Sequence, residues 1–261
     1  MNLVHLLREK LIAWLTGISP HYRADHFADF EALKATLKPG DVLLVEGETR
    51  VARIIQLLTR SNWSHAALYV GDRAIMHPDA EVRQHAEEFG EEAGELLLEA
   101  DIETGVALVP LSRYRTHPVR VCRPVGIEKS DWEMLLNSLF VRLCEKYDTA
   151  QMLDLLRYLL PFGHLPARLA QKLWMYRAGT DSRTICSTMI VEAFQAVRYP
   201  VLPEIPEVCF DKGLCYRVRN ARLFVPADFD HSPFFRVIKH QGVDHPRFNE
   251  EPFKPELIHW A

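Results

Sequence analysis

The chain has 261 residues, of which 48% are hydrophobic, 25% charged and 10% aromatic, a balance typical of folded globular proteins and unlike that of disordered or collagen-like chains. The formal net charge of -4 argues against a nucleic-acid partner, because binding to phosphate backbones requires clustered Lys and Arg. Five cysteines, odd in number and without a C-x-x-C pair, argue against a disulfide framework.

The first 15 residues space their apolar side chains as an amphipathic helix does, but Arg8, Glu9 and Lys10 interrupt the run. This interruption argues against a signal peptide, and the sequence shows no apolar run of about 18 residues, the length needed to cross a bilayer. We expect residues 1–36 to form a helical extension that docks on its own domain. The alternative is peripheral contact with a membrane through this helix, in a protein that we expect in the cytoplasm.

Strand, helix and strand patterns come next in the chain. The turn sequence at residues 37–41 introduces an apolar run over 42–45, which predicts a strand. Residues 49–59 have apolar side chains at helical spacing, and strand character resumes over 64–70. The Glu-rich residues 79–95, which also contain glycine, are expected to form an exposed loop, with a mobile flap as the alternative.

The middle of the chain is strand-rich, and helical periodicity follows it. Three more strands are expected over residues 96–100, 105–110 and 119–123. Two helices are expected over residues 132–143 and 149–160, and a short strand over 223–225. Residues 152–174 are unusually apolar, so they either pack in the core or cover a hydrophobic substrate groove.

Cys186 stands at the start of a predicted helix whose apolar side chains form one stripe as far as residue 197. Unpaired backbone N–H groups and the positive end of the helix dipole stabilise a thiolate in such a first turn. The same amides can bind an oxyanion, and Thr184 or Ser182 could cap the helix. The alternative is that Cys186 only packs in the core, so a base has to be found elsewhere in the sequence.

His65 lies in an alternating strand, where it shares a face with Ala67 and Tyr69. Ala67 is small and leaves space beside the imidazole, although a hydrogen-bonded core histidine would have the same pattern. Glu99 closes an apolar strand, where an unpaired carboxylate would be costly, and His65 is a suitable partner for it. Cys186, His65 and Glu99 then make a constellation in which the imidazole takes the thiol proton and the carboxylate fixes the tautomer.

Other catalytic patterns are missing from the sequence. It contains no G-x-S-x-G elbow, no phosphate-binding G-x-x-x-x-G-K loop and no H-E-x-x-H zinc motif. The 12 histidines do not cluster as metal ligands do. We therefore expect neither a metal nor another cofactor.

Six segments match a known pattern when they are taken together and in order. They are PGDVLL at 39–44, WSHAALY at 63–69, LEA at 98–100, KYD at 146–148, ICSTMI at 185–190 and VPAD at 225–228. This series resembles the permuted NlpC-type papain-like cysteine hydrolase family, which includes the YiiX/YebB group of bacterial proteins. The resemblance spans about residues 37–230, and Thr188 departs from the Glu that the family usually has there.

The resemblance implies an α+β, circularly permuted papain-like (NlpC-type) fold, in which an antiparallel sheet packs against helices, including the helix that carries Cys186. The permuted branch places its histidine before its cysteine, as this chain does. The implied domains are a helical extension at 1–36, a catalytic domain at 37–230 and a C-terminal tail at 231–261 packed on that domain.

The implied chemistry is attack of the Cys186 thiolate on an amide carbonyl, giving a thioester that water resolves. We therefore predict a cysteine hydrolase acting on a peptide or peptidoglycan-fragment-like amide, with substrate-binding positions at Tyr147, Ser64 and Ser187. One alternative is a lipid acyltransferase or acyl hydrolase of the lecithin:retinol-acyltransferase-like type. Another is a binding module that keeps the fold without activity. The expected partner is a small peptide, amide or acylated substrate.

Overall fold

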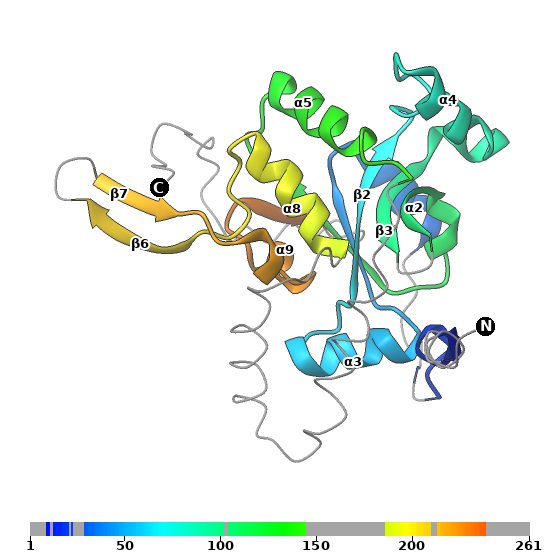
Figure 1. Ribbon diagram of the computed structural model, residues 1–261, viewed down its shortest axis with the longest axis horizontal. Coiled ribbons are helices and arrows are strands. Elements are labelled where there is room, and N and C mark those ends of the chain that lie inside the picture. Colours follow the sequence, from blue (N-terminus) through cyan, green and yellow to red (C-terminus); the bar gives the residue numbers. More distant parts are fainter. Residues whose placement is uncertain are drawn as a thin grey trace.

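The computed structural model describes residues 9–10, 13–20, 22, 29–101, 104–144, 186–209 and 213–238, except for the side chains of 204–209 and 213–217. These residues form an α+β fold with a six-stranded antiparallel sheet and a separate two-stranded hairpin (Figure 1). The strands are β1 Val42–Val45, β2 His65–Gly71, β3 Leu96–Asp101, β4 Gly105–Pro110, β5 Val119–Pro124, β6 Glu204–Cys209, β7 Gly213–Arg217 and β8 Phe235–Ile238. The helices are α2 Phe30–Thr36, α3 Arg50–Thr59, α4 Ala80–Glu87, α5 Lys129–Phe140, α8 Cys186–Ala196 and α9 Ala227–His231, with the 3-10 helices η1 Gly90–Gly94, η2 Leu111–Tyr114 and η3 Ala221–Leu223.

The strands of the main sheet lie in the order β4-β3-β2-β1-β5-β8, and every neighbouring pair is antiparallel. β1 lies in the interior of the sheet, and all four of its residues are buried. Burial on both faces accounts for its unbroken apolar sequence. The strands predicted over residues 42–45, 64–70, 96–100, 105–110 and 119–123 are confirmed to within one residue at each end.

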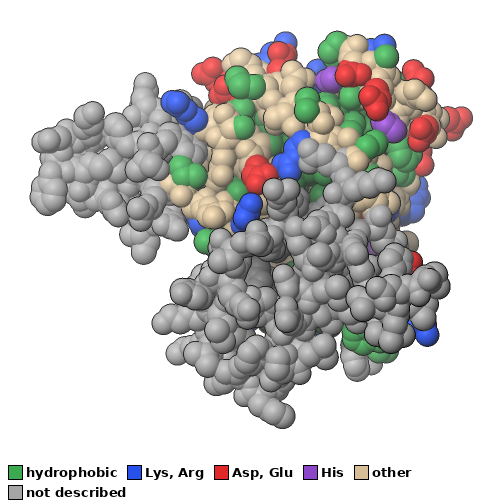
Figure 2. Space-filling model, viewed as in Figure 1, with side chains coloured by type: hydrophobic (Ala, Val, Ile, Leu, Met, Phe, Trp, Pro, Cys, Tyr) green, Lys and Arg blue, Asp and Glu red, His purple; other side chains and the backbone are tan. Residues whose placement is uncertain are grey.

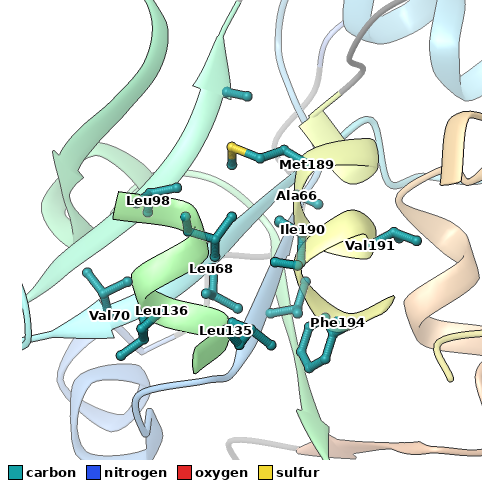
Figure 3. Close-up of a cluster of buried hydrophobic side chains, with 14 of the residues drawn as sticks. Ala66, Leu68, Val70, Leu98, Leu135, Leu136, Met189, Ile190, Val191 and Phe194 are labelled. Atoms are coloured by element: carbon teal, nitrogen blue, oxygen red, sulfur yellow. The ribbon is translucent and has the colours of Figure 1, made fainter. Parts of the chain in front are cut away.

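Two buried layers pack on opposite faces of this sheet. Ala66 and Leu68 of β2 belong to the layer that contains side chains of α5 and α8. Figure 3 shows Leu135 of α5 and Ile190 of α8 gathered against them. Ala67, which lies between them on β2, belongs to the other layer, together with residues of α2 and η2. The alternation of side chains along β2 therefore divides the core into two.

The turn before β1 is held by a buried ion pair between Asp41 and Arg123 of β5. Arg123 donates from Nε and Nη2 to the two carboxylate oxygens of Asp41, each at 2.7 Å. Asp41 Oδ2 also accepts a hydrogen bond from the Lys38 N–H at 2.8 Å. Gly40 in the same turn has a φ of +104°, which favours glycine. One carboxylate thus joins the turn to a strand 82 residues further along the chain.

Asp41→Ala is expected to lower the free energy of unfolding by about 3 kcal/mol, because the Arg123 guanidinium loses its carboxylate partner and keeps only the Thr36 carbonyl, and the Lys38 N–H loses its acceptor. Urea unfolding followed by circular dichroism measures the change. Asp72→Ala is the matched control, since Asp72 contacts Arg73 only at 4.0 Å and both side chains are about half exposed. Its effect should stay under about 1 kcal/mol, and equal losses in the two variants would contradict the role given to Asp41.

Residues 79–95 are mostly exposed, as expected, but they form the helices α4 and η1, so the expectation of a loop is wrong. Asp79 caps α4 by accepting a hydrogen bond from the Glu81 N–H at 2.8 Å, and η1 follows. Val82 and Ala86 are buried in the core. The carboxylates of this segment stay exposed and form the acidic surface over α4 at the upper right of Figure 2. Val82 and Ala86 lie four residues apart, which is a helical spacing, but the many glutamates around them made a loop the expected structure.

The strand expected over residues 223–225 is also wrong, because this stretch begins with η3. The Val225 N–H donates to Asp228 Oδ2 at 2.9 Å instead of to a neighbouring strand. Asn220 accepts a hydrogen bond from the Arg222 N–H at 3.0 Å, which favours the turn. Side chains therefore satisfy the backbone groups that a strand would have paired.

β8 lies within residues 231–261, which the sequence assigned to a tail, and it pairs with β5 at the edge of the sheet. Phe235 at its start is buried against Phe194 of α8, with the ring centroids 5.2 Å apart. The Tyr199 hydroxyl donates to the Phe234 carbonyl at 2.6 Å and accepts from the Val125 N–H at 2.8 Å. The main sheet thus continues past residue 230.

The helix predicted over residues 132–143 is α5, which begins and ends three residues earlier. The helix predicted over 149–160, the apolar residues 152–174 and most of residues 1–15 lie outside the described residues. Across the described ranges, none of the helices has the length and apolar character needed to cross a membrane.

Candidate active site

His65 and Glu99 meet across neighbouring strands. His65 begins β2, and Glu99 of β3 pairs in register with Ala67, two residues further along β2. Side chains two residues apart on a strand share a face, so this register brings the carboxylate to the imidazole. His65 Nε2 lies 3.0 Å from Glu99 Oε2, with the His65 side chain 19% exposed and the Glu99 side chain 0% exposed. The pairing expected from the sequence is present in the structure.

Cys186 joins this pair from the first turn of α8. Its side chain lies beside the His65 imidazole, near enough that the charge of Cys186 raises the pKa of that ring, and the residue is 6% exposed. Met189 and Ile190 of α8 are fully buried in the core and anchor this helix there. Because Glu99 occupies Nε2 of the imidazole, Nδ1 is the ring nitrogen left for the thiol. The proposed capping residues of this helix lie outside the described residues.

The charges of Cys186, His65 and Glu99 shift the pKa values of His65 and Glu99. Burial lowers the pKa of His65, but the neighbouring charges of Cys186 and Glu99 and their hydrogen bonds outweigh it, so the pKa ends well above 6.5. Burial raises the pKa of Glu99, but the His65 charge and the hydrogen bonds from His65 and Tyr114 outweigh it, so that pKa ends below 4.5. The arrangement therefore favours an imidazolium next to an ionised carboxylate.

Two further residues contact Glu99, and sequence reasoning missed both. Tyr114 donates its hydroxyl hydrogen to Oε2, and Arg113 Nη1 lies 3.6 Å from Oε1. Arg113 Nη2 also lies 3.5 Å from Asp101 Oδ2. Both residues belong to η2, which follows β4, the strand next to β3. Their only sequence signal is this position, directly after a strand that neighbours the one carrying the carboxylate.

The two serines expected to bind substrate lie beside the site with their hydroxyls engaged. Ser64 Oγ accepts a hydrogen bond from the Gly47 N–H at 2.9 Å. The approach is so close that a Cβ added to Gly47 would lie 2.9 Å from the same oxygen. Ser187 Oγ donates to the Phe224 carbonyl at 2.8 Å. Both serines are buried and hold the protein's own backbone, so a contact with substrate stays a prediction for them. Tyr147 lies outside the described residues.

Metal ligands are not assigned to this site. Within the ranges that the structure describes, no three His, Cys, Asp or Glu side chains are grouped in a way that could hold a metal ion. The His65 and Glu99 side chains are instead bound to each other.

Comparison with known proteins identifies a similar fold among solved structures. No protein-family model matches the chain, and no curated protein does either. Among solved structures, the chain is similar to the crystal structure of the metalloprotein yiiX from Escherichia coli O157:H7. The two share 15% sequence identity, the match covers 77% of this chain and 96% of that chain, and the TM-score is 0.44. The YiiX/YebB group belongs to the family that the six sequence segments resemble.

Proposed function

We propose that this chain is a cysteine hydrolase that cleaves an amide bond in a peptide or peptidoglycan-fragment-like substrate. One observation carries the proposal: His65 of β2 lies between two groups, with the Glu99 carboxylate of β3 at 3.0 Å from Nε2 and Cys186 of α8 near enough to act on the pKa of the ring. A thiol nucleophile, its base and a carboxylate that orients the base are what such chemistry requires. Because the histidine strand precedes the cysteine helix, a circularly permuted papain-like fold fits this arrangement.

In the first step, the Cys186 thiolate attacks the carbonyl carbon, and a C–S bond forms while the oxygen takes the negative charge. Amides in the first turn of α8 would stabilise that oxygen. When the C–N bond breaks, the His65 imidazolium gives its proton to the leaving amine, and a thioester remains. Neutral His65 then takes a proton from water as the water oxygen attacks the thioester carbon. The C–S bond breaks, the acid leaves, and the thiolate and imidazolium are restored.

Glu99 would act on His65 and not on the substrate. Its carboxylate accepts the Nε2 hydrogen bond, so Nδ1 is the nitrogen that exchanges protons with the reacting groups. The negative charge of Glu99 also stabilises the imidazolium that the first step needs. Full burial of the carboxylate strengthens both effects, because water does not screen them.

Acyl transfer or ester hydrolysis uses the same pair of groups and is the second candidate. The unusually apolar sequence of residues 152–174 favours it, since an acylated substrate needs apolar surface. In that reaction an alcohol or amine, in place of water, would resolve the thioester.

Turnover of amide and acyl-ester probes by the wild-type chain and by Cys186→Ala tests the proposal. We expect amide hydrolysis that falls by at least about 10³-fold in Cys186→Ala, because the nucleophile is gone. Cys122→Ala is the matched control: burial raises the pKa of that thiol, and its loss should leave turnover unchanged. Ester turnover with transfer to an added amine would favour the acyltransferase. No turnover of any probe by the wild type would indicate a binding module, and equal, measurable rates in wild type and Cys186→Ala would overturn Cys186 as the nucleophile.

A further inference from the structure

Two neighbouring residues of η2 approach both oxygens of the Glu99 carboxylate. Tyr114 donates to Oε2, the oxygen that His65 Nε2 contacts at 3.0 Å. Arg113 Nη1 lies 3.6 Å from Oε1. The contacts of Oε2 orient the carboxylate, and the Arg113 charge near Oε1, an oxygen that accepts no hydrogen bond within the described part of the chain, favours its ionised form. The turn after β4 thus determines how Glu99 faces His65.

Tyr114 has the properties of a fixed donor. The residue is 7% exposed, and its ring lies in the buried layer that also contains Leu97 and Leu111. The pKa of the Tyr114 hydroxyl is raised, mainly by burial and then by the charge of Glu99. The hydroxyl therefore keeps the hydrogen that it donates. Its ring centroid lies 6.1 Å from that of His65.

We propose that Tyr114 is a positioning residue that keeps Glu99 ionised and oriented toward the His65 imidazole. The proposal rests on the proposed function in one respect, which is that His65 serves as the base. Tyr114 also packs against the core through its ring. Removing the hydroxyl alone therefore separates the positioning role from the packing role.

The pH at which Glu99 takes up a proton is the quantity that tests the role of Tyr114. The titratable and charged groups around the Glu99–His65 pair are Cys186 of α8, Arg113 and Tyr114 of η2, Asp101 of β3, and His117, whose ring meets that of Tyr114 at 5.5 Å. Because the hydrogen bond from Tyr114 lowers the pKa of Glu99, losing the hydroxyl raises that pKa. On acidification the carboxylate then takes up its proton at a higher pH. One hydrogen bond to a charged group corresponds to a shift of about one to two pH units.

Tyr114→Phe and Tyr69→Phe form a matched pair for the experiment. Tyr69 is also 7% exposed and lies in the same buried layer, but the charges that act on its hydroxyl are those of Glu95, Asp72 and Asp41. The ¹H and ¹⁵N resonances of the His65 imidazole are followed from neutral to acidic pH in the full chain. We expect the acid midpoint to rise by about one to two pH units in Tyr114→Phe and to stay unchanged in Tyr69→Phe.

Equal midpoints in the wild type and in both variants would overturn the positioning role of Tyr114. A shifted midpoint, together with Cys186 alkylation that does not respond to His65→Ala, would support the positioning role and remove the proposed hydrolase function. If Tyr114→Phe does not fold, 3-fluorotyrosine placed at position 114 alone keeps the ring and makes the hydroxyl a stronger donor. The midpoint is then expected to move to lower pH, and an unmoved midpoint would overturn the proposal.

Discussion

His65→Ala is expected to slow the alkylation of Cys186 by iodoacetamide at pH 6 by about 100-fold. Only the thiolate reacts, and an ordinary thiol with a pKa near 8.5 is about 0.3% ionised at pH 6. In the wild type, a positive imidazolium beside the thiol favours the thiolate. Burial lowers the pKa of His65, but the charges of Cys186 and Glu99 raise it well above 6.5, so the imidazolium is the main form at this pH. Alanine at position 65 removes that charge.

Mass spectrometry of each cysteine gives the rates, with Cys144 as the reference thiol in the same sample. Cys144 is exposed and contacts His85 Nε2 at 3.3 Å, so His65→Ala should leave its rate unchanged. Cys186 is 6% exposed, and accessibility alone would make it the slower of the two. Faster labelling of Cys186 than of Cys144 at pH 6 would therefore point to a thiolate. If Cys186 is inert in both chains, the hydrolase proposal fails and a binding module is favoured.

Glu99→Ala is expected to lower the free energy of unfolding by about 3 kcal/mol near pH 6. The fully buried carboxylate is the shared acceptor of the His65 imidazolium and the Tyr114 hydroxyl, and it lies beside Arg113. Removing one member of a buried ion pair is costly, because the charge that stays behind is poorly hydrated. The expected loss lies at the lower end of the usual range, since His65 and Arg113 keep some contact with water.

The stability lost in Glu99→Ala should depend on pH, and the pKa shifts of Glu99 and His65 determine how. Burial raises the pKa of Glu99, but His65 and the hydrogen bonds bring it below 4.5, so its contribution is present above about pH 4.5 and fades as the pH falls through the folded value. Burial lowers the pKa of His65, but its charged neighbours bring it above 6.5, so its contribution is complete below about pH 6.5 and fades as the pH rises through the folded value. The difference between wild type and Glu99→Ala is therefore expected to be largest from about pH 4.5 to 6.5.

Urea unfolding at a series of pH values measures this difference. Glu99→Gln keeps the size of the side chain and removes the charge, so it should weaken the pH dependence of the unfolding free energy while it loses less stability than Glu99→Ala. Glu95→Ala is the surface control, since Glu95 pairs with Lys34 at 2.7 Å in a partly exposed position, and only a small change is expected. A loss in Glu99→Ala that is constant from pH 4 to 8 would contradict the ion pair with His65.

The elements that the sequence predicted well are those whose signals lie within the element itself. α3 was expected over residues 49–59, and Thr49 caps it by accepting a hydrogen bond from the Ala52 N–H at 3.1 Å. β4 was expected over residues 105–110 and has these bounds, because Gly105 and Pro110 mark its two ends. Alternation along β2 likewise identified which of its residues face each core layer.

The site could be predicted only as a set of residue types. Cysteine, histidine and glutamate suggested a constellation, but their contact depends on the pairing of Ala67 with Glu99, which is a property of two strands and not of either one. Arg113 and Tyr114 were missed for the same reason. They reach Glu99 only because η2 folds back beside β3, and no local pattern in the sequence records that approach.

β8 also determines how far the chain can be shortened. Residues 235–238 cover the outer edge of β5, whose N–H and C=O groups would otherwise face solvent. A chain that ended at residue 230 would expose this edge, together with the aromatic rings that Phe235 contacts, those of Phe194, Tyr199 and Phe229. Uncovered strand edges beside apolar surface pair with those of other molecules. Monodisperse protein for crystallisation therefore requires a chain that extends at least to Ile238.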